Sequence, residues 1–409
     1  MSSAPLAPHA PPPALWRLVL AGLSASLVGI GLARFAYKPL LPPLIQAHWF
    51  ASADVVTLGA ANLAGYLVGA MVGRPLGARL GHRAALRAMM LLVTAAFLAC
   101  AWPLSVGWYF GWRFASGVAG GAIMVLAAGT LLPHVAPARR GITSGAIFLG
   151  LGLGIEGSGT LVPLLLHEGL RATWFGLAAI SALFTAASWF AWPRPAHAAL
   201  AAQAGAAAAD APAHVPARAV RSFYAQYALM AFGFVPTMLF LVDFVARGLG
   251  EGTRSGALAW VFYGVGAIVG PPLYGLLGDR LGGRVGLRAV LAVQALAMLV
   301  LGAVQGPVEV ALLAVVLGSF PPGVVPLALA RVHELEPRSH ARQQVMWSRA
   351  TILFAATQAI AGYANSAMFN ASGGDYRRLF LIAAAGYVAS VVVDLVPLTR
   401  AADRKPAAA

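Results

Sequence analysis

A twelve-residue segment that occurs twice constrains this chain more than any other feature of its sequence. The segment reads LGARLGHRAALR from Leu76 to Arg87 and LGDRLGGRVGLR from Leu277 to Arg288. Eight of the twelve positions are identical, and each copy joins two long apolar runs. A charged, glycine-rich turn that recurs between hydrophobic runs indicates a membrane protein built from two related halves.

The composition agrees with a chain that crosses a membrane several times. Hydrophobic residues make up 60% of the 409 residues, and charged residues only 10%. The apolar runs are continuous and about 20 residues long or longer, which suits a transmembrane α-helix rather than a barrel strand. We therefore predict an all-α polytopic membrane protein with twelve transmembrane helices in two pseudo-symmetric six-helix bundles.

The predicted boundaries follow from the apolar runs and from the segments rich in Pro and Ala. We expect residues 1–14 to form a disordered N-terminus and residues 398–409 a short tail. The two bundles are predicted to span residues 15–192 and 221–397. The long connection between them, residues 193–220, is polar and proline-containing, and it is typical of a linker between halves.

The net charge of +15 is explained by membrane topology and requires no nucleic-acid partner. Most of the 28 Lys and Arg residues fall in segments that the twelve-helix arrangement places on one side. Basic loops concentrate on the cytoplasmic side of membrane proteins, so we expect both termini in the cytoplasm. The loops on the other side hold only Arg171, Arg247, Arg254, Arg377 and Arg378.

The second copy of the repeat resembles the signature loop of a known transporter family. Gly275 to Arg284 reads Gly-x-x-Gly-Asp-Arg-x-Gly-x-Arg, which is similar to the loop between helices 2 and 3, repeated between helices 8 and 9, of the major facilitator superfamily. The first copy departs from the pattern, with Ala78 in place of the acid. The resemblance implies that fold and a secondary transporter, not an enzyme. The residues expected in the gating loops are Gly77, Arg79, Gly81, Arg83, Gly278, Asp279, Arg280, Gly282 and Arg284.

The first apolar run carries a second resemblance. Arg34 to Pro39 reads Arg-Phe-Ala-Tyr-x-Pro, similar to a run in the first helix of an uncharacterised bacterial branch of that superfamily. We therefore expect the protein in a bacterial inner membrane. Arg113 likewise begins a stretch that resembles the family's fourth-helix motif, in which an arginine is associated with proton coupling; alternatively, neighbouring carbonyls satisfy it.

Ionisable side chains at membrane depth are costly, so they mark a solute path or a charge partner. Four cations and two acids in the predicted spans are candidates to face a cavity, and a cavity that all of them faced would be positive and would favour an anionic solute. For Lys38, snorkelling toward the outer interface is the alternative. The residues expected to bind substrate are Arg34, Tyr37, Lys38, Arg113, Tyr227 and Arg349.

The two acids are the candidates for carrying a coupling proton. Glu156 lies among glycines near mid-depth of the fifth span, where desolvation favours a protonated carboxyl. It could instead be a counter-ion to Arg113 or Arg34. Asp243 is the second candidate, and its depth in the seventh span matches that of Lys38 in the first. We therefore predict that Lys38 and Asp243 pair when the outer side closes.

The predicted function is secondary active transport of a small organic solute, anionic by the charge argument and proton-coupled by resemblance. The alternatives are proton-driven efflux of lipophilic or drug-like compounds and a membrane sensor that does not transport. An efflux protein should tolerate neutralisation of Arg34, whereas an anion carrier should not. We expect a monomer in the lipid bilayer, whose partners are the solute and protons, with no cofactor and no metal.

Overall fold

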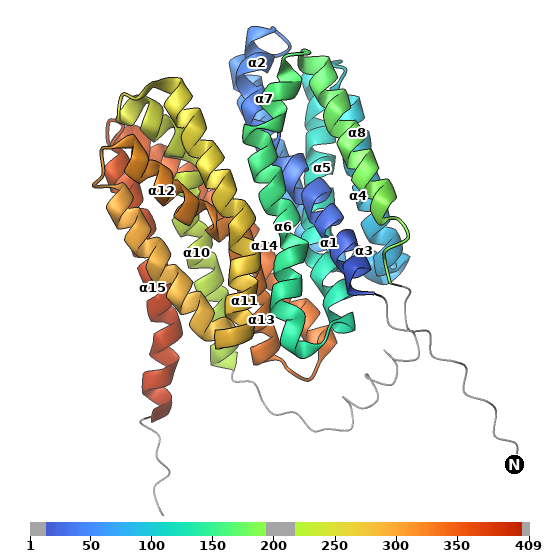
Figure 1. Ribbon diagram of the computed structural model, residues 1–409, viewed down its shortest axis with the longest axis vertical. Coiled ribbons are helices and arrows are strands. Elements are labelled where there is room, and N and C mark those ends of the chain that lie inside the picture. The colour runs from blue at the N-terminus through green and yellow to red at the C-terminus, as the bar shows by residue number, and fades with distance from the viewer. Residues whose placement is uncertain (1–13, 194–216, 403–409) are drawn as a thin grey trace, which may run out of the picture.

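The computed structural model describes residues 14–193 and 217–402, and this part of the chain is helical without any strand (Figure 1). The first half contains α1 (Leu15–Ser26), α2 (Leu41–Gln46), α3 (Ser52–Leu80), α4 (His82–Cys100), α5 (Val106–Leu131), α6 (Arg140–Gly159), α7 (Leu161–Leu166) and α8 (Leu170–Ser188). The second half contains α10 (Ala217–Asp243), α11 (Gly252–Leu301), α12 (Pro307–Gly318), α13 (Phe320–Leu335), α14 (His340–Ala371) and α15 (Tyr376–Ala402). The predicted linker, residues 193–220, lies mostly outside the described residues.

The predicted all-α membrane fold is confirmed. Eight of the helical segments are long and apolar enough to cross a membrane, and α11 alone is long enough to cross it twice. The remaining crossings are α3, α14 and the pair α6–α7. These helices are less apolar because each contacts the other half of the molecule, α3 and α14 through each other and α6 through α11. Interior positions between bundles do not need to match lipid.

The two copies of the repeated segment have the same backbone conformation at one glycine. Gly81, between α3 and α4, and Gly282, inside α11, both have φ of 79°. Only glycine adopts this region without strain, so both positions require it. We predicted a loop between two spans at the second copy. As at Gly81 between α3 and α4, a single residue, Gly282, interrupts the helical backbone of α11 there. Its two parts are therefore separate crossings.

Small residues, such as Gly65, Gly69 and Gly73 at every fourth position of α3, let the helices approach closely. In the first half, a Cβ on Gly73 of α3 would lie 2.9 Å from the Cα of Ala122 of α5. Between the halves, α6 packs along α11, and a Cβ on Gly145 would lie 2.9 Å from the carbonyl carbon of Pro271. This contact between α6 and α11 holds the two bundles side by side in Figure 1.

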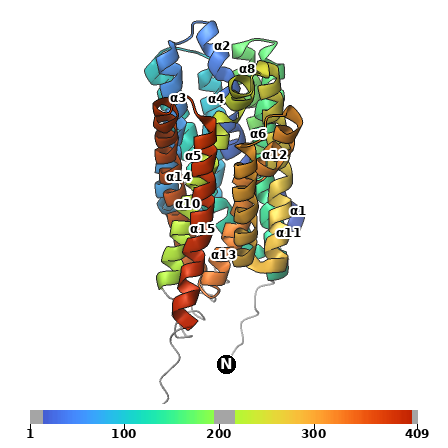
Figure 2. The same ribbon diagram turned by 90° about the vertical axis from the view of Figure 1, so that its left-hand side faces the viewer.

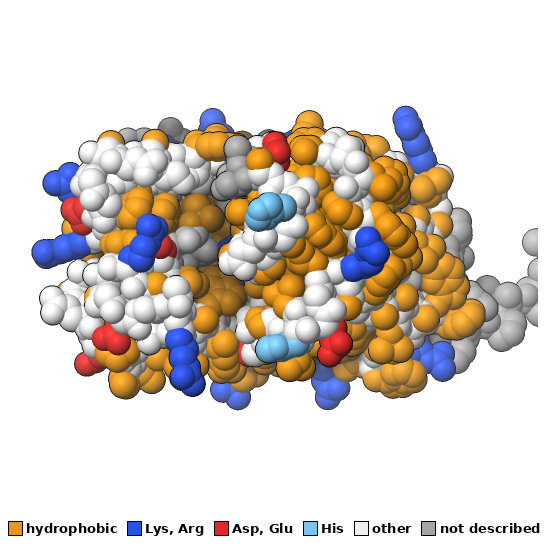
Figure 3. Space-filling view, turned by 90° about the horizontal axis from the view of Figure 1, so that it is seen from above, with side chains coloured by type: hydrophobic (Ala, Val, Ile, Leu, Met, Phe, Trp, Pro, Cys, Tyr) orange, Lys and Arg blue, Asp and Glu red, His pale blue; other side chains and the backbone are white. Residues whose placement is uncertain are grey.

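The molecule has two chemically different ends. One end, called the basic end below, carries the two repeated loops with Arg79 and Arg280, and the described residues also begin and finish there (Figures 1 and 2). The opposite end carries α2 and the loop between α7 and α8. Figure 3 shows the opposite end, with a hollow between the halves in which hydrophobic side chains lie.

The first crossing is irregular where its charged residues lie. After α1, a π-helix spans Leu27–Phe35, and a 3-10 turn at Lys38–Leu40 connects it to α2. The prolines at 39, 42 and 43 cannot donate backbone hydrogen bonds, which accounts for the short turns at this end. π-helical turns are rare and frequently lie at functional sites. This one carries Arg34.

Candidate functional site

A central cavity lies between the two halves, near the middle of the helices that form it. The centres of water-sized molecules can occupy about 40 Å³ of it, which is room for a few waters. Arg34 is the only charged residue among those that line it. The lining residues are Ile30, Arg34, Phe35, Tyr66, Met124, Leu151, Tyr227, Phe234, Pro321, Val325, Thr351, Phe354 and Gln358.

Arg34 presents an incompletely paired guanidinium to this cavity. Its Nη2 atom is buried and has no hydrogen-bond partner in the structure. Its Cζ lies 5.4 Å from the centre of the Tyr66 ring and 5.6 Å from that of Phe35, so the aromatic faces stabilise the charge in part. A buried donor without a partner is costly, which makes this atom a candidate contact for an anionic group.

Aromatic side chains of the second half form the facing wall. The Phe354 ring centre lies 4.9 Å from that of Tyr227 and 5.6 Å from that of Phe234, with which it stacks at an angle of 17°. Thr351 and Gln358 add polar groups from α14. The Thr351 hydroxyl donates to the Trp347 carbonyl, and Gln358 Nε2 donates to the Met238 sulfur at 3.5 Å.

Two predicted binding residues lie inside the first bundle rather than in the cavity wall. Arg113 donates from Nη1 to the Ala33 carbonyl at 2.9 Å, and its Cζ lies 4.3 Å from the centre of the Tyr37 ring. The Tyr37 hydroxyl donates to the Val55 carbonyl at 3.1 Å. One carbonyl and one aromatic ring contact the Arg113 guanidinium there, and its buried Nε has no hydrogen-bond partner among the described residues. Both residues thus support the helix that carries Arg34.

Arg349 does not face the cavity either. It is exposed on α14 and interacts with Tyr224 on the outside of the bundle. Cavity-lining Thr351 follows two positions later, and residues two apart on an α-helix point about 200° apart. The depth of Arg349 was predicted from the sequence, but the rotation of α14 turns it away from the cavity.

Lys38 joins the two halves on the opposite-end side of the cavity. Its Nζ donates to the Met238 carbonyl of α10 at 2.8 Å and lies 4.6 Å from the centre of the Trp260 ring of α11. Trp260 in turn donates from Nε1 to the Ser158 hydroxyl of α6 at 3.1 Å. Lys38 is therefore part of a contact between halves, as expected for a gate residue.

The predicted partner of Lys38 is bound elsewhere. Asp243 forms an ion pair with Arg247 one turn further on, and it accepts a 2.5 Å hydrogen bond from the Tyr376 hydroxyl. The predicted pair of Lys38 with Asp243 is thus not formed in this structure. Asp243 lies five residues beyond Met238, and local partners on its own helix and on α15 satisfy it.

We expect Lys38→Met to loosen the opposite end, because it removes a charged hydrogen bond and a cation–π contact between halves. Each such contact is worth on the order of 1–3 kcal/mol, so opening should increase roughly tenfold. Maleimide labelling of Ser158→Cys, in a Cys100→Ser background, measures this opening. Asp243→Asn is the matched control. Labelling as fast in Asp243→Asn as in Lys38→Met would instead support the predicted pair of Lys38 with Asp243.

Glu156 lies between α6 and α11 and is not among the residues that line the cavity. Its side chain crosses Gly264 of α11, where a Cβ would lie 2.8 Å from the Glu156 Cα. The Oε2 atom is buried without a hydrogen-bond partner in the described structure, and no ion pair with Arg34 or Arg113 is formed. The counter-ion alternative is therefore not seen here, and the carboxyl is positioned at the interface between the halves.

The second repeated loop closes the basic end. The two carboxylate oxygens of Asp279 accept hydrogen bonds from the backbone N–H groups of Gly141 and Ile142, each at 2.8 Å. These groups belong to the first turn of α6, where N–H donors have no partner within the helix. The acid of the second repeat therefore binds the start of a helix that belongs to the other half.

The first repeated loop has no corresponding acid, and its arginines are bound differently. In the second half, Asp394 of α15 pairs with Arg284 at 3.0 Å and with Arg288 at 2.6 Å. In the first half, the residue equivalent to Arg288 is Arg87, which bonds the Trp189 carbonyl and lies 4.4 Å from the centre of the Trp189 ring. The charged network is therefore confined to one half.

The other predicted loop residues are glycines that pack against neighbouring side chains and arginines that are exposed or half-buried. Gly77 is tightly packed, since a Cβ there would lie 2.7 Å from Leu126 and from His82. Gly278 has more room, since a Cβ there would lie 3.4 Å from Leu327. Arg79 and Arg280 are exposed, whereas Arg83 is half-buried.

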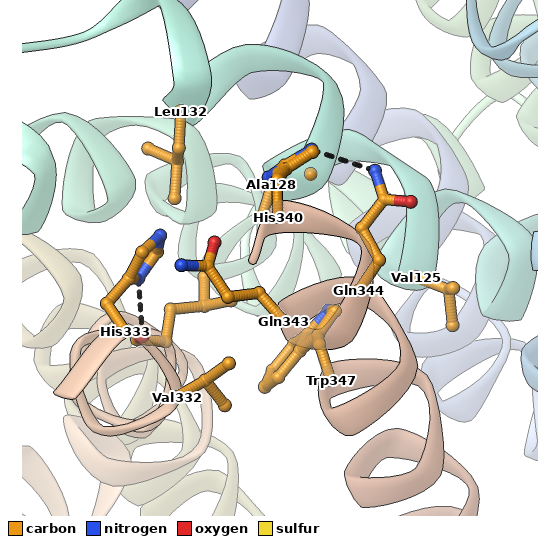
Figure 4. Close-up of a pocket in the computed structure, with 11 residues that line it drawn as sticks. Val125, Ala128, Leu132, Val332, His333, His340, Gln343, Gln344 and Trp347 are labelled. Carbon is orange, nitrogen blue, oxygen red and sulfur yellow. Dashed lines mark hydrogen bonds between the residues drawn. The ribbon is translucent and has the colours of Figure 1, made fainter. Parts of the chain in front are cut away.

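A small second cavity, lined by two histidines, lies between the halves near the basic end (Figure 4). His333 contacts the Leu329 carbonyl at 2.7 Å, and His340 contacts Gln344 at 3.0 Å. Trp347 crosses between the halves and donates to the Met124 carbonyl at 3.0 Å. The residues that line this second cavity include no carboxylate. In the described parts of the chain, no group of residues could hold a metal ion.

Sequence reasoning missed most of the residues that line the cavity and one charged residue that supports the fold beside it. Phe354 and Gln358 belong to the cavity wall, and Asp394 is 3% exposed at the centre of the arginine network. An ionisable residue inside the apolar run at 377–397 was a signal that could have identified Asp394. Phe354 had no such signal, because an aromatic residue in a membrane helix usually packs or faces lipid.

Comparison with known proteins supports this arrangement. Residues 26–395 match the model of a family described as "Uncharacterised MFS-type transporter YbfB". The structure is similar to that of the proton:xylose symporter XylE bound to 6-bromo-6-deoxy-D-glucose, with a TM-score of 0.71 and 14% identity over 92% of this chain and 94% of that chain. A XylE variant with two tryptophan substitutions gives the same TM-score at 18% identity and the same coverage. A search of curated proteins found no match.

Proposed function

The chain belongs to the family of YbfB-type transporters of the major facilitator superfamily, and on that premise we propose that it carries a small organic anion coupled to protons. It is a multi-pass membrane protein of the transporter class and not an enzyme. The observation that carries the anion proposal is Arg34. It brings a guanidinium whose buried Nη2 has no hydrogen-bond partner to a cavity between the halves, and no carboxylate is among the residues that line this cavity.

The contacts between halves support an alternating-access cycle. At the basic end, Asp279 binds the start of α6, and Trp347 bonds the Met124 carbonyl. At the opposite end, Lys38 bonds the Met238 carbonyl, and a hollow leads inward between the halves (Figure 3). The conformation is therefore closed at the basic end. By the distribution of basic loops we assign that end to the cytoplasm of a bacterial inner membrane, with both termini there.

Glu156 is our candidate for the coupling proton. Its carboxyl lies at the contact of α6 with α11, which must change when the halves move, and Oε2 has no partner in the described structure. A carboxyl that is protonated in one conformation and ionised in the other links proton movement to that change. Asp243 is a weaker candidate, because Arg247 and Tyr376 bind it in the state described here.

We expect Glu156→Gln to keep anion binding but to lose acceleration of uptake by an imposed pH gradient. The amide resembles the protonated carboxyl and cannot release a proton. Uptake into proteoliposomes, with and without the gradient, measures this difference, and Glu168→Gln in the loop before α8 is the matched control. Full gradient-driven accumulation by Glu156→Gln would assign the proton to another residue.

Thermal unfolding of the purified protein tests the anion proposal before the solute is identified. Cys100 is the only cysteine and is 1% exposed, so a thiol-reactive dye reports unfolding directly. A bound solute raises stability according to its occupancy. We expect stabilisation by carboxylates in a panel that also contains neutral sugars and lipophilic cations. Stabilisation by sugars alone would contradict the proposal.

Efflux of lipophilic compounds remains the second candidate, and the apolar wall of the cavity favours it. Phe35, Phe234 and Phe354 would bind a hydrophobic compound without any contribution from Arg34. In that case lipophilic compounds should stabilise the protein equally in the wild type and in Arg34→Gln. Dependence of the stabilisation on Arg34 therefore separates the two functions.

A further inference from the structure

We propose that the solute of the central cavity is a monocarboxylic acid with a flat, apolar body, such as an aromatic ring. This inference rests on the proposed anion-carrier function and narrows it to one chemical class. It follows from three properties of the residues that line the cavity: how many charges they carry, of which sign, and where their aromatic rings lie.

A single cation among the lining residues favours a single negative charge on the solute. Arg34 is that cation, and its buried Nη2 has no partner. The nearest candidate for a second cation, Lys38, already bonds the Met238 carbonyl and contacts the Trp260 ring. Arg349 faces away from the cavity. The second charge of a dicarboxylate would therefore be desolvated without a counter-ion, which is unfavourable.

The absence of acids from the lining disfavours solutes that also carry an amine. No Asp or Glu is among the residues that line the cavity, and Glu156 lies further along α6, between α6 and α11. The ammonium group of an amino acid would have to compete with Arg34 for the same carboxylate or remain unpaired. A zwitterion is thus a poorer fit than a simple acid.

The facing wall fits a flat apolar group. Phe354 lies between Tyr227 and Phe234, and its ring stacks with that of Phe234 at an angle of 17°. Tyr66 and Phe35 lie on the side of Arg34, within 5.6 Å of its Cζ. Aromatic rings prefer offset-stacked or edge-to-face contact with another ring. A solute ring that extends from a carboxylate bound to Arg34 would meet such faces on the other half.

The same wall is poorly suited to a polyol. A sugar needs several hydrogen bonds, because each buried hydroxyl without a partner is costly. The Thr351 hydroxyl already donates to the Trp347 carbonyl, and one N–H of Gln358 donates to the Met238 sulfur, so α14 has few donors left for a polyol. The likeness to a xylose symporter therefore extends to the fold, whereas the lining indicates a different solute.

Binding of such an acid would also bring the two halves together. Its carboxylate would contact Arg34 in the first half, and its ring would contact Phe354 in the second. The cavity has room for only a few waters, so the solute must enter a more open form that then closes around it. An acid without a ring would contact only the first half. It would therefore stabilise the closed form of the protein less than an acid with a ring does.

Four probes of the full-length protein in detergent test the solute class by thermal unfolding. Benzoate has both features, benzamide lacks the charge, acetate lacks the ring, and phthalate carries a second charge. We expect benzoate to bind at least about tenfold more tightly than each of the other three, because every one of them loses a contact or adds an unpaired charge. Arg34→Gln should abolish the effect of benzoate.

Phe354→Leu tests the position of the ring. We expect it to weaken benzoate binding about three- to tenfold, the loss typical of one aromatic pair, and to leave acetate binding unchanged. Phe175→Leu on the exposed face of α8 is the matched control and should have no effect. If Phe354→Leu unfolds without any probe at a much lower temperature, Phe234→Leu replaces it, with the same expectation.

The outcomes separate this inference from the function on which it rests. If acetate stabilises the protein as strongly as benzoate, and Arg34→Gln removes the effect, the anion carrier stands and the flat apolar body is overturned. If phthalate does so, the anion carrier stands and the single negative charge is overturned. If benzamide stabilises as well as benzoate and Arg34→Gln changes nothing, both proposals are wrong. Weaker binding of benzoate in Phe354→Leu, with unchanged acetate binding, supports the flat apolar body.

Discussion

Replacement of Arg34 by Gln is expected to abolish the stabilisation that organic anions give to this protein, with a loss of affinity of at least about tenfold. A hydrogen bond to a charged group contributes about 1.5–3 kcal/mol, and about 1.4 kcal/mol corresponds to a factor of ten. Gln keeps a donor in the cavity but removes the charge. Tyr66 and Phe35, which now contact the guanidinium, remain to fill the wall.

Arg349→Gln is the matched control for this result, because it removes the same charge from the exposed face of α14. Anion binding in this variant should equal that of the wild type. Thermal unfolding at Cys100 over a range of anion concentrations measures both variants under the same conditions. An equal loss of affinity in the two variants would mean that general positive charge, and not a specific site at Arg34, attracts the anion.

Asp279→Asn is expected to shift the protein strongly toward the form that is open at the basic end. The carboxylate accepts two backbone hydrogen bonds from the start of α6, and an amide can accept only one of them while it presents its own donors to the other. The loss of charge also weakens the interaction with the helix dipole. Together these effects are worth on the order of 1.5–3 kcal/mol, about tenfold or more in population.

A cysteine in place of Ala128 reports this opening. Ala128 is 1% exposed and lines the small cavity between the halves near the basic end. In a Cys100→Ser background, a hydrophilic maleimide should label Ala128→Cys about tenfold faster when Asp279→Asn is also present. Ala78→Asp, at the equivalent position of the first repeat, should not abolish uptake. Unchanged labelling in Asp279→Asn would show that other contacts close this end.

Much of the fold could be predicted because the signals are local and repeated. Runs of apolar residues predict the crossings, and the two copies of the charged turn predict two halves. The structure confirms the equivalence of the copies through the positive φ of Gly81 and Gly282. The break inside α11 was less predictable, since a single glycine there replaces the expected loop.

The cavity could be predicted only in part, because depth along a helix does not determine its rotation. Arg34 and Tyr227 line the cavity as expected, whereas Arg349 points outward although it was predicted from the same kind of evidence. Arg113 is deep and buried, but Tyr37 and a carbonyl bind it inside one bundle. Whether a charge faces a cavity depends on packing between helices far apart in the sequence.

The partners of the charged residues were the least predictable feature. Lys38 and Asp243 have matching depth and opposite charge, yet each has a nearer partner, Met238 for Lys38 and Arg247 for Asp243. The missing acid at position 78 did predict that the two loops differ. That Asp394 collects the arginines of only the second loop required the packing of α15 against α11.

Solute exchange in proteoliposomes tests most directly whether the central cavity is a transport site that uses Arg34. Vesicles are loaded with the unlabelled carboxylate or sulfonate that stabilises the protein most, and they are then diluted into a trace of the labelled anion. We expect a transient accumulation of label with the wild type and with Arg349→Gln, but none with Arg34→Gln. Accumulation with Arg34→Gln equal to that of the wild type would contradict a transport site built around Arg34.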